Sequence, residues 1–453
     1  MNTEKKIMAA GAAVGAVAAS LPVVIGLAQT TLPKSIDEND YLIIENGHFC
    51  TRYGARVQLR GINLNDELFY FKKADMPSFA PNYDIFDEFE ERFGRYGARK
   101  LTQTYNENFI TASDLRKIKA LGANCVRIPL RYRNLFKKES CRGEIKFDYL
   151  DSVVEACRKA GLYVIFELHS APGFQNNASA GGSKSKCVLF DSTSAGLEAR
   201  NAVIKLWTQV AVHFRKDPTV AAFDLLNRPL SNVAGWEEKT DALNKFYSKL
   251  YKELRVVDKN RILIMQSSHS VENLPVFDEP VRNVAYGLYS RFNSTFETDS
   301  LISKIKNIKD KNIPVIICKL RWDKTLSYTL SALCSNGISW LFGDYKGPAG
   351  SSYLYRGNPE YADFDVDKFD AIEEKWTKPL ATKNFEQNKE LAKILKAHFS
   401  RGYMRSNKKE AKKASPKTAK KVKFKPTFNA KIGANLLVGG KNTSAAPKLK
   451  EKV

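Results

Sequence analysis

Short apolar runs alternate with longer amphipathic stretches over most of this chain, and that alternation limits the possible folds more than any other feature. Eight runs have the length and composition of buried strands: 57–63, 124–128, 163–168, 220–226, 262–265, 284–288, 314–318 and 338–342. Helical stretches, with apolar residues three and four positions apart, are 113–121, 149–160, 197–214, 236–256, 300–308, 326–335 and 388–398. Nearly continuous apolar strands, each followed by a helix, indicate a parallel sheet covered on both faces. Eight such units predict an α/β fold, a closed (β/α)8 TIM barrel.

Two further segments modify the expected barrel. Residues 41–44 and the Asn46-Gly47 turn predict an N-terminal β-hairpin that plugs the bottom of the barrel. An insertion rich in Phe, Tyr and Glu, at about 69–99, predicts a lid or wall over the barrel mouth, the face where the strands end. Chemistry in such barrels lies on the loops after the strands, so we expect the functional residues there.

The two ends of the chain differ in composition from its middle. The uncharged stretch 7–33 predicts an export signal over 1–28, cleaved before Gln29. An uncleaved membrane anchor over 7–28 is the alternative. Export implies a periplasmic, cell-surface or extracellular location. We expect a linker over 29–40, the barrel over 41–400 and a flexible Lys-rich tail over 401–453.

Much of the formal net charge of +23 lies in the C-terminal tail. Residues 401–453 hold sixteen Lys or Arg against two acidic residues, Glu410 and Glu451. Such a segment predicts electrostatic attachment to an anionic polymer, a membrane surface or a protein partner. Nucleic acid is disfavoured because few aromatic residues interleave with the charges. A solvated tail that only keeps the protein soluble is the alternative.

The seven cysteines give no indication of a metal site or a cofactor. None of them falls in a CxxC pair, so their spacing predicts no zinc site. An odd number leaves at least one thiol free if disulfides form.

Polar residues collect where the predicted strands end. They are Asn63, Asn65, Arg127, His169, Asn227, Arg228, Tyr289, Arg291, Lys319, Arg321 and Asp344. Around them the chain resembles glycoside hydrolase family 5, the cellulase and exo-glucanase-like barrels. The matching segments are LRGINL at 59–64, LGANCVRIPL at 121–130, GLYVIFELHSAPGFQN at 161–176, FDLLNRP at 223–229 and NIPVIICK at 312–319. The resemblance covers about 41–400 in order and spacing, and it implies a polysaccharide as the partner at the barrel mouth.

The chain departs from the family at its two catalytic glutamates. The resemblance puts the acid/base position at Arg228 and the nucleophile position at Lys319. A retaining mechanism needs two carboxyls about 5 to 5.5 Å apart, and neither a guanidinium nor an ammonium can replace them. We therefore expect no catalytic residue, and interpret the chain as an inactive glycosidase-like barrel that acts as a glycan-binding or structural module.

Other residues at the strand ends are candidates for ligand binding. They are Arg127, His169, Asn227, Arg228, Tyr289, Arg291, Lys319 and Trp340. For Arg127, His169 and Asn227 the simplest role is structural hydrogen bonding at the barrel rim, and a residual glycan cleft is the other. The two cations either attract a uronate, sulfate or phosphate group, or pair with nearby carboxylates and fill a dead site.

Hydrolysis by relocated carboxylates is the alternative function. The reaction would cleave O-glycosyl bonds of a β-glucan-like polysaccharide, and the candidate groups are Glu167, Asp224 and Asp344. Glu167 precedes His169 by two residues, so both point to the same side of one strand, with Glu167 one layer deeper in the barrel. Asp344 is the best placed of the three by its motif position.

Overall fold

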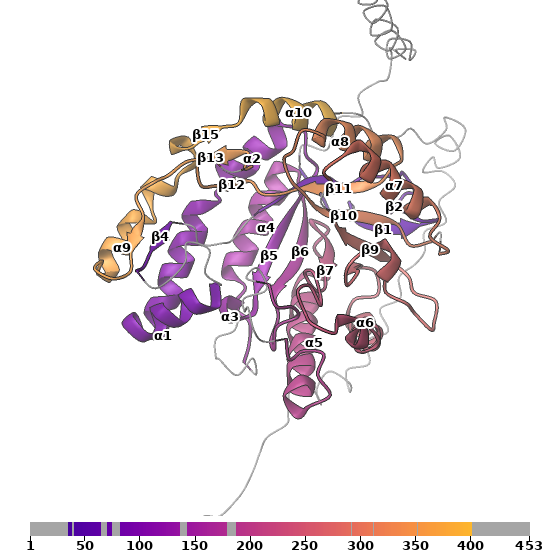
Figure 1. Ribbon diagram of the computed structural model, residues 1–453, viewed down its shortest axis with the longest axis horizontal. Helices are drawn as coiled ribbons and strands as arrows, with labels where there is room; N and C mark the ends of the chain where they lie inside the picture. Colours follow the sequence, from indigo (N-terminus) through magenta and orange to yellow (C-terminus); the bar gives the residue numbers. More distant parts are fainter. Residues whose placement is uncertain are drawn as a thin grey trace, which may run out of the picture. The chain divides into compact units, whose positions relative to one another are not determined.

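Eight parallel strands close into a barrel at the centre of the computed structural model (Figure 1). The structure describes residues 35–38, 40–64, 70–74, 82–135, 143–178, 187–290, 292–310, 312–350 and 352–400. The barrel strands are β3 (Arg60–Asn63), β5 (Cys125–Arg131), β6 (Tyr163–Ser170), β7 (Val220–Asp224), β8 (Ile262–Gln266), β9 (Val284–Tyr289), β10 (Val315–Leu320) and β11 (Ser339–Phe342). Strand β11 pairs with β3 and closes the ring. Each strand lies within one predicted apolar run or overlaps it, which confirms the predicted TIM barrel.

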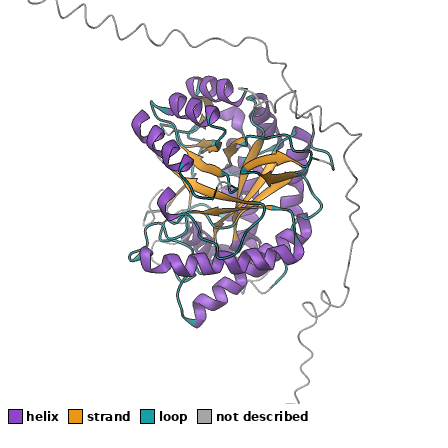
Figure 2. Cartoon of the chain, turned by 90° about the vertical axis from the view of Figure 1, so that its right-hand side faces the viewer, coloured by secondary structure: helices purple, strands orange, loops and turns teal. Residues whose placement is uncertain are grey.

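Helices surround the strands, as Figure 2 shows in purple around orange. Those that correspond to predicted stretches are α2 (Ala112–Ala120), α4 (Asp148–Ala160), α5 (Ser194–Phe214), α6 (Trp236–Val257), α7 (Thr295–Lys306), α8 (Leu326–Ser335) and α10 (Lys389–Phe399). Helix α4 shows why the pattern works, because Leu150, Val154 and Cys157 are buried along one face. It ends at Gly161, whose φ of 67° is a left-handed conformation that glycine adopts without steric cost.

A β-hairpin closes the bottom of the barrel. Strands β1 (Leu42–Glu45) and β2 (His48–Thr51) pair antiparallel. Asn46 and Gly47 join them with positive φ at both residues, the conformation of a type I′ turn. Leu42 and Phe49 are buried in one apolar cluster with residues from the strand interiors, such as Ile262. The predicted hairpin is confirmed. The buried Ile36, from the expected linker, belongs to the same cluster.

The insertion after the first strand contains a long helix, α1 (Asn82–Phe109), which packs against α9 (Phe369–Lys375). The helix is kinked at Gly94, whose φ of 66° and ψ of 169° are not helical. Aromatic rings of Phe89 and Trp376 meet edge to face in the packed layer. Neither helix was predicted as such from the sequence, and α1 extends beyond the expected insertion.

Short elements complete the described chain. They are α3 (Tyr132–Leu135), β4 (Phe71–Lys72), β12 (Lys346–Gly347), β13 (Tyr355–Arg356), β14 (Ala362–Asp363), β15 (Glu386–Gln387) and the 3-10 turns η3 (Val271–Asn273), η4 (Lys378–Leu380) and η5 (Thr382–Asn384). The predicted export signal over 1–28, its anchor alternative over 7–28 and the tail over 401–453 lie outside the described residues. Among the described helices, none combines the length and apolar composition needed to cross a membrane.

Candidate functional site

A buried ionic group lies inside the barrel and joins three neighbouring strands. The Arg127 guanidinium, from β5, contacts Glu167 of β6 at 3.1 Å and Asp224 of β7 at 2.6 Å. It also donates to Asn63 Oδ1 at 3.0 Å. Gln266, at the end of β8, donates its side-chain amide to both oxygens of Asp224, at 3.0 and 2.8 Å. These side chains share one interior layer because alternate residues of barrel strands point inward.

The two carboxyls of this group have opposite pKa shifts. Burial would raise the pKa of Glu167, but the Arg127 charge and the hydrogen bond from His169 outweigh it and hold that pKa at about 2. Burial and the neighbouring charge of Glu167 raise the pKa of Asp224 to about 6, despite the lowering effect of Arg127. Glu167 is therefore an ionised structural partner, while Asp224 is the carboxyl of the pair that takes up a proton more readily.

His169 lies one layer closer to the barrel mouth. Its Nδ1 is 2.7 Å from Glu167 Oε1 and 3.4 Å from Asn227 Nδ2. Within the described part of the chain, its Nε2 is buried and has no hydrogen-bond partner. Gln175 donates to the backbone carbonyls of His169 and Asn227, at 2.8 and 3.0 Å, and so ties the loops after β6 and β7 together. The structure thus brings Arg127, His169 and Asn227 together, as their motif positions suggested.

Arg228, where the resemblance puts the acid/base position, has its guanidinium over an aromatic ring. Its guanidinium carbon lies 4.3 Å from the ring centre of Tyr289, a cation–π contact. Its Nη2 donates to Ser231 Oγ at 2.8 Å, and its backbone N–H donates to Gln266 Oε1 at 3.0 Å. The residue has a positive φ of 48°. Arg228 is thus held by its backbone and by its side chain.

Lys319, where the resemblance puts the nucleophile position, forms an ion pair. Its Nζ is 2.6 Å from Asp344 Oδ1, and both side chains are mostly buried. The methylene groups of Lys319 pass close to Gly343. If a residue other than glycine stood there, its Cβ would lie 2.9 Å from Lys319 Cε. The resemblance puts the sugar-stacking Trp of the family at Gly343, so lysine methylenes lie against the position of that missing side chain.

Two other sequence-predicted residues are not placed in this group. Trp340 is fully buried, and its ring stacks on Phe399 of α10 at 5.0 Å between centres. It therefore lies in the outer layer between β11 and α10 and does not face the mouth. Arg291 lies outside the described residues.

Sequence reasoning missed Gln266 as a site residue. It contacts both Asp224 and the Arg228 backbone. The available signal was its position as the first polar residue after the apolar run of β8, the same signal that drew attention to Asn63. For metals, no group of three or more His, Cys, Asp or Glu that could hold an ion occurs among the described residues.

Solved structures with the same fold include two cellulose-degrading enzymes. A hyperthermophilic endocellulase from Pyrococcus horikoshii superposes with a TM-score of 0.51 at 12% identity, covering 80% of this chain and all of that one. A broad-specificity endoglucanase from Clostridum cellulovorans gives 0.50 at 19% identity, covering 76% and 94%. At these identities the likeness shows a shared fold.

Sequence relatives are glycosidases. A beta-xylosidase of Phanerodontia chrysosporium is 25% identical over 260 residues, which is 55% of this chain and 51% of that protein. A glucan 1,3-beta-glucosidase of Candida oleophila is 29% identical over 196 residues, or 41% and 44%. The chain spans about half the length of these relatives. The family model for cellulase, glycosyl hydrolase family 5, matches residues 87–342. Because that match covers more than half of the chain, including seven of the eight barrel strands, the chain belongs to glycosyl hydrolase family 5.

Proposed function

We propose that this protein is a catalytically inactive family 5 barrel that acts as a glycan-binding or structural module. The observation that carries the proposal is how two cations are held, at the positions where the resemblance puts the catalytic glutamates. Arg228 is held over Tyr289 and Lys319 is paired with Asp344. A guanidinium cannot donate a proton at neutral pH, and a lysine ammonium cannot form the glycosyl ester of a retaining mechanism.

The remaining carboxylates support the same proposal. Glu167 has a pKa of about 2 and is bound to Arg127, so it holds no proton to give to a leaving group near neutrality. Asp224 is fully buried, and Arg127 and Gln266 occupy its oxygens. Asp344 is engaged by Lys319. Each candidate nucleophile or acid already has a tight partner of its own.

The barrel mouth keeps one feature that favours a ligand. Nε2 of His169 is buried and has no partner among the described residues, and buried polar groups are nearly always satisfied. A sugar hydroxyl can accept from or donate to an imidazole nitrogen.

The Lys319–Asp344 pair supports a filled site rather than a mouth that binds anions strongly, because one of the two cations is already neutralised.

The proposal also includes export through residues 1–28 and attachment through the basic tail, 401–453. Their support is compositional: an uncharged Ala- and Gly-rich stretch at 7–33 and sixteen basic residues in the tail. We propose that the tail contacts an acidic glycan, a membrane surface or a protein.

An active hydrolase is the second candidate function. It is favoured by the relatives, which are a xylosidase and glucan glucosidases. It needs two of Glu167, Asp224 and Asp344 as working groups. Asp224, with a pKa of about 6, is the one whose protonation suits a general acid.

A hydrolysis assay separates the two functions. The purified protein is incubated with β-glucans, mannans, xylans and aryl glycosides, alongside Asp344→Asn and Glu167→Gln. We expect no turnover above the buffer blank for any of the three proteins. Turnover that either substitution abolishes would establish the hydrolase and overturn the proposal.

Restoring the carboxylates tests how much of the sugar site persists. Arg228→Glu with Lys319→Glu would place a second carboxylate beside Asp344, and the two like charges would repel. We therefore expect more activity from the triple variant that adds Asp344→Asn than from the double variant. Activity in neither variant would indicate that the mouth has lost its fit to a sugar and would favour a structural module.

A further inference from the structure

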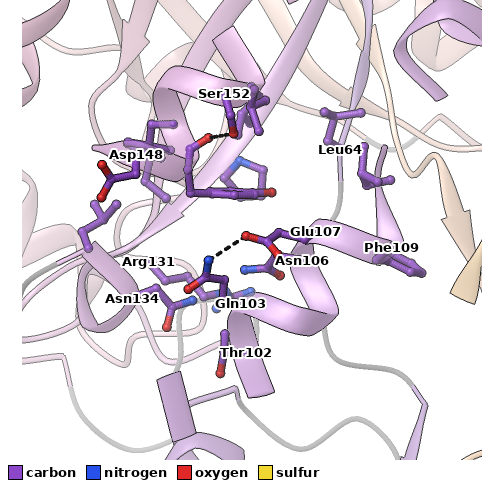
Figure 3. A pocket seen from close by; sticks show the side chains of 18 of the residues that line it. Leu64, Thr102, Gln103, Asn106, Glu107, Phe109, Arg131, Asn134, Asp148 and Ser152 are labelled. Carbon is purple, nitrogen blue, oxygen red and sulfur yellow. Dashed lines mark hydrogen bonds between the residues drawn. The ribbon is translucent and has the colours of Figure 1, made fainter. Parts of the chain in front are cut away.

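A pocket of about 470 Å³ lies outside the barrel wall, beside the end of β5 (Figure 3). Side chains of α1, α2, α3 and α4 line it together with β5. On β5, Arg127 contacts the interior ionic group, whereas Ile128 and Leu130 line this pocket. Pro129 and Arg131, at the end of the strand, line it as well, whereas none of Glu167, His169, Asp224 and Asn227 does. Its volume is typical of small-molecule sites, which span about 300 to 1,000 Å³.

Hydrogen-bonding side chains line the pocket from opposite sides. Gln103 of α1 and Asn134 of α3 lie across it from Asp148 and Ser152 of α4 (Figure 3). Gln103 is oriented by a hydrogen bond of 2.6 Å to Glu107 on the next turn of α1. Three amide side chains contribute in total, and each offers both donors and acceptors. They are Gln103, Asn106 and Asn134.

Rings and aliphatic groups supply the remaining surface. Tyr149 and Phe109 line the pocket with Ile128 and Leu130. The charged residues of the lining are of both signs: Arg99, Arg131 and Lys146 against Glu107 and Asp148. The balance is close to neutral, which does not favour a strongly charged ligand. A wholly apolar ligand would leave the amides without partners at a cost in free energy.

We propose that this pocket binds a neutral saccharide and is a second glycan site, separate from the barrel mouth. A sugar ring has hydroxyls that both donate and accept, which the amide and carboxylate side chains match. Its C–H faces pack on aromatic and aliphatic side chains, which the half-buried Tyr149 and Ile110 provide. The site does not depend on the mouth, so it binds whether or not the mouth does.

Calorimetric titration of the full chain with laminaribiose, cellobiose, mannobiose and xylobiose tests the proposal. We expect at least one of the four disaccharides to bind. The double variant Gln103→Ala with Asn134→Ala should weaken that binding tenfold or more. Both side chains are exposed at the pocket edge, so their truncation leaves the core intact.

Two control variants locate the binding. Asn336→Ala removes an exposed amide at the end of α8, away from the pocket, and should leave the affinity within twofold. Arg228→Ala alters the mouth and should also leave it within twofold. Absence of binding by every disaccharide, or an affinity that the double variant does not change, would overturn the inference. Affinity lost with Arg228→Ala alone would assign the sugar to the mouth. That result would overturn this inference and leave the proposed function standing. Catalytic turnover, in contrast, would overturn only the proposed function.

Discussion

Arg127 holds two buried carboxylates that would otherwise repel each other. Glu167 and Asp224 are partners in the pairing of β6 with β7, and both are almost fully buried. A single guanidinium contacts both. Removal of one member of a buried ionic group leaves the other charges uncompensated in a medium of low polarity. The stability of this part of the barrel therefore depends on one side chain.

We expect Arg127→Met to lower the free energy of unfolding by about 3 to 5 kcal/mol. Urea denaturation followed by circular dichroism measures the change. Lys245→Met, which removes an exposed helix pair with Asp241, is the matched control and should not shift the midpoint. A loss for Arg127→Met as small as that of the control would show that the buried group contributes nothing to stability.

Asp224 makes stability depend on pH in a direction unusual for a carboxyl. Its folded-state pKa of about 6 is above the ordinary value of 3.8. The folded state therefore holds a proton that the unfolded chain has lost. The resulting stabilisation is full below about pH 4 and is lost as the pH rises through about 6, with a magnitude on the order of 3 kcal/mol.

Unfolding free energies measured in urea from pH 4 to pH 7 test this. The fall in stability with rising pH should be present in the natural protein and absent in Asp224→Asn. Asp241→Asn, which changes an exposed carboxylate paired with Lys245, serves as the control and should keep the fall in stability. An identical pH profile for Asp224→Asn and the natural protein would contradict the prediction.

At the residue scale, the motifs predicted which residues gather at the strand ends better than they predicted what those residues contact. The resemblance suggested Arg228 and Lys319 for the catalytic positions, and pairing with nearby carboxylates was one of the two roles expected for them. It did not indicate that Arg228 would lie over Tyr289, because that depends on the positive φ of the residue. Trp340 faces the outer layer because side chains alternate between the inside and the outside of the barrel along β11. A motif match alone does not indicate which side a residue faces.

Helix α10 closes the outer layer over β11, and one side chain fixes its start. Asn388 is the N-cap, and its side-chain oxygen accepts from the Leu391 backbone N–H at 3.1 Å. The last turn carries Phe399, on which Trp340 stacks. An N-cap satisfies a backbone donor that would otherwise lack a partner inside the helix.

Asn388→Ala should therefore lower the free energy of unfolding by about 1 kcal/mol. Asn388→Ser keeps a capping oxygen and should restore most of that stability. Thermal and urea unfolding of the three proteins provide the comparison. Equal destabilisation by Ala and Ser would show that the loss does not come from the cap.

At the element scale, the regular repeat was predictable and the insertion was not. Eight apolar strands and seven amphipathic helices carry their periodicity in the sequence. Helix α1 was not predicted, because Gly94 interrupts it, although its buried Leu101, Tyr105 and Phe109 follow a helical spacing. Its buried surface is defined by packing on α9, which follows almost 260 residues later along the chain. Local patterns contain no information about such a distant partner.

The whole molecule carries its positive charge unevenly. Sixteen basic residues against two acidic ones lie in 401–453, out of a formal net charge of +23. Association through such a segment releases counterions, so it weakens steeply as salt rises. The barrel itself has a much smaller excess of positive charge.

Retention on an acidic polymer such as heparin should therefore fall when residues 401–453 are removed. The full chain should elute at a higher salt concentration than the truncated one, measured on the same column over one salt gradient. A tail variant with eight lysines changed to glutamine keeps the length and is the control for chain length. Elution of all three proteins at the same salt concentration would show that the tail has no electrostatic role in binding.

The Arg127 group and the Lys319–Asp344 pair are separate parts of one barrel. Arg127, Glu167, Asp224 and Gln266 bind one another inside it, while Lys319 is paired with Asp344. The strands are thus cross-linked by side chains that belong to the frame of the barrel. Loops at the mouth of such a barrel can diverge in role while the frame beneath them is kept.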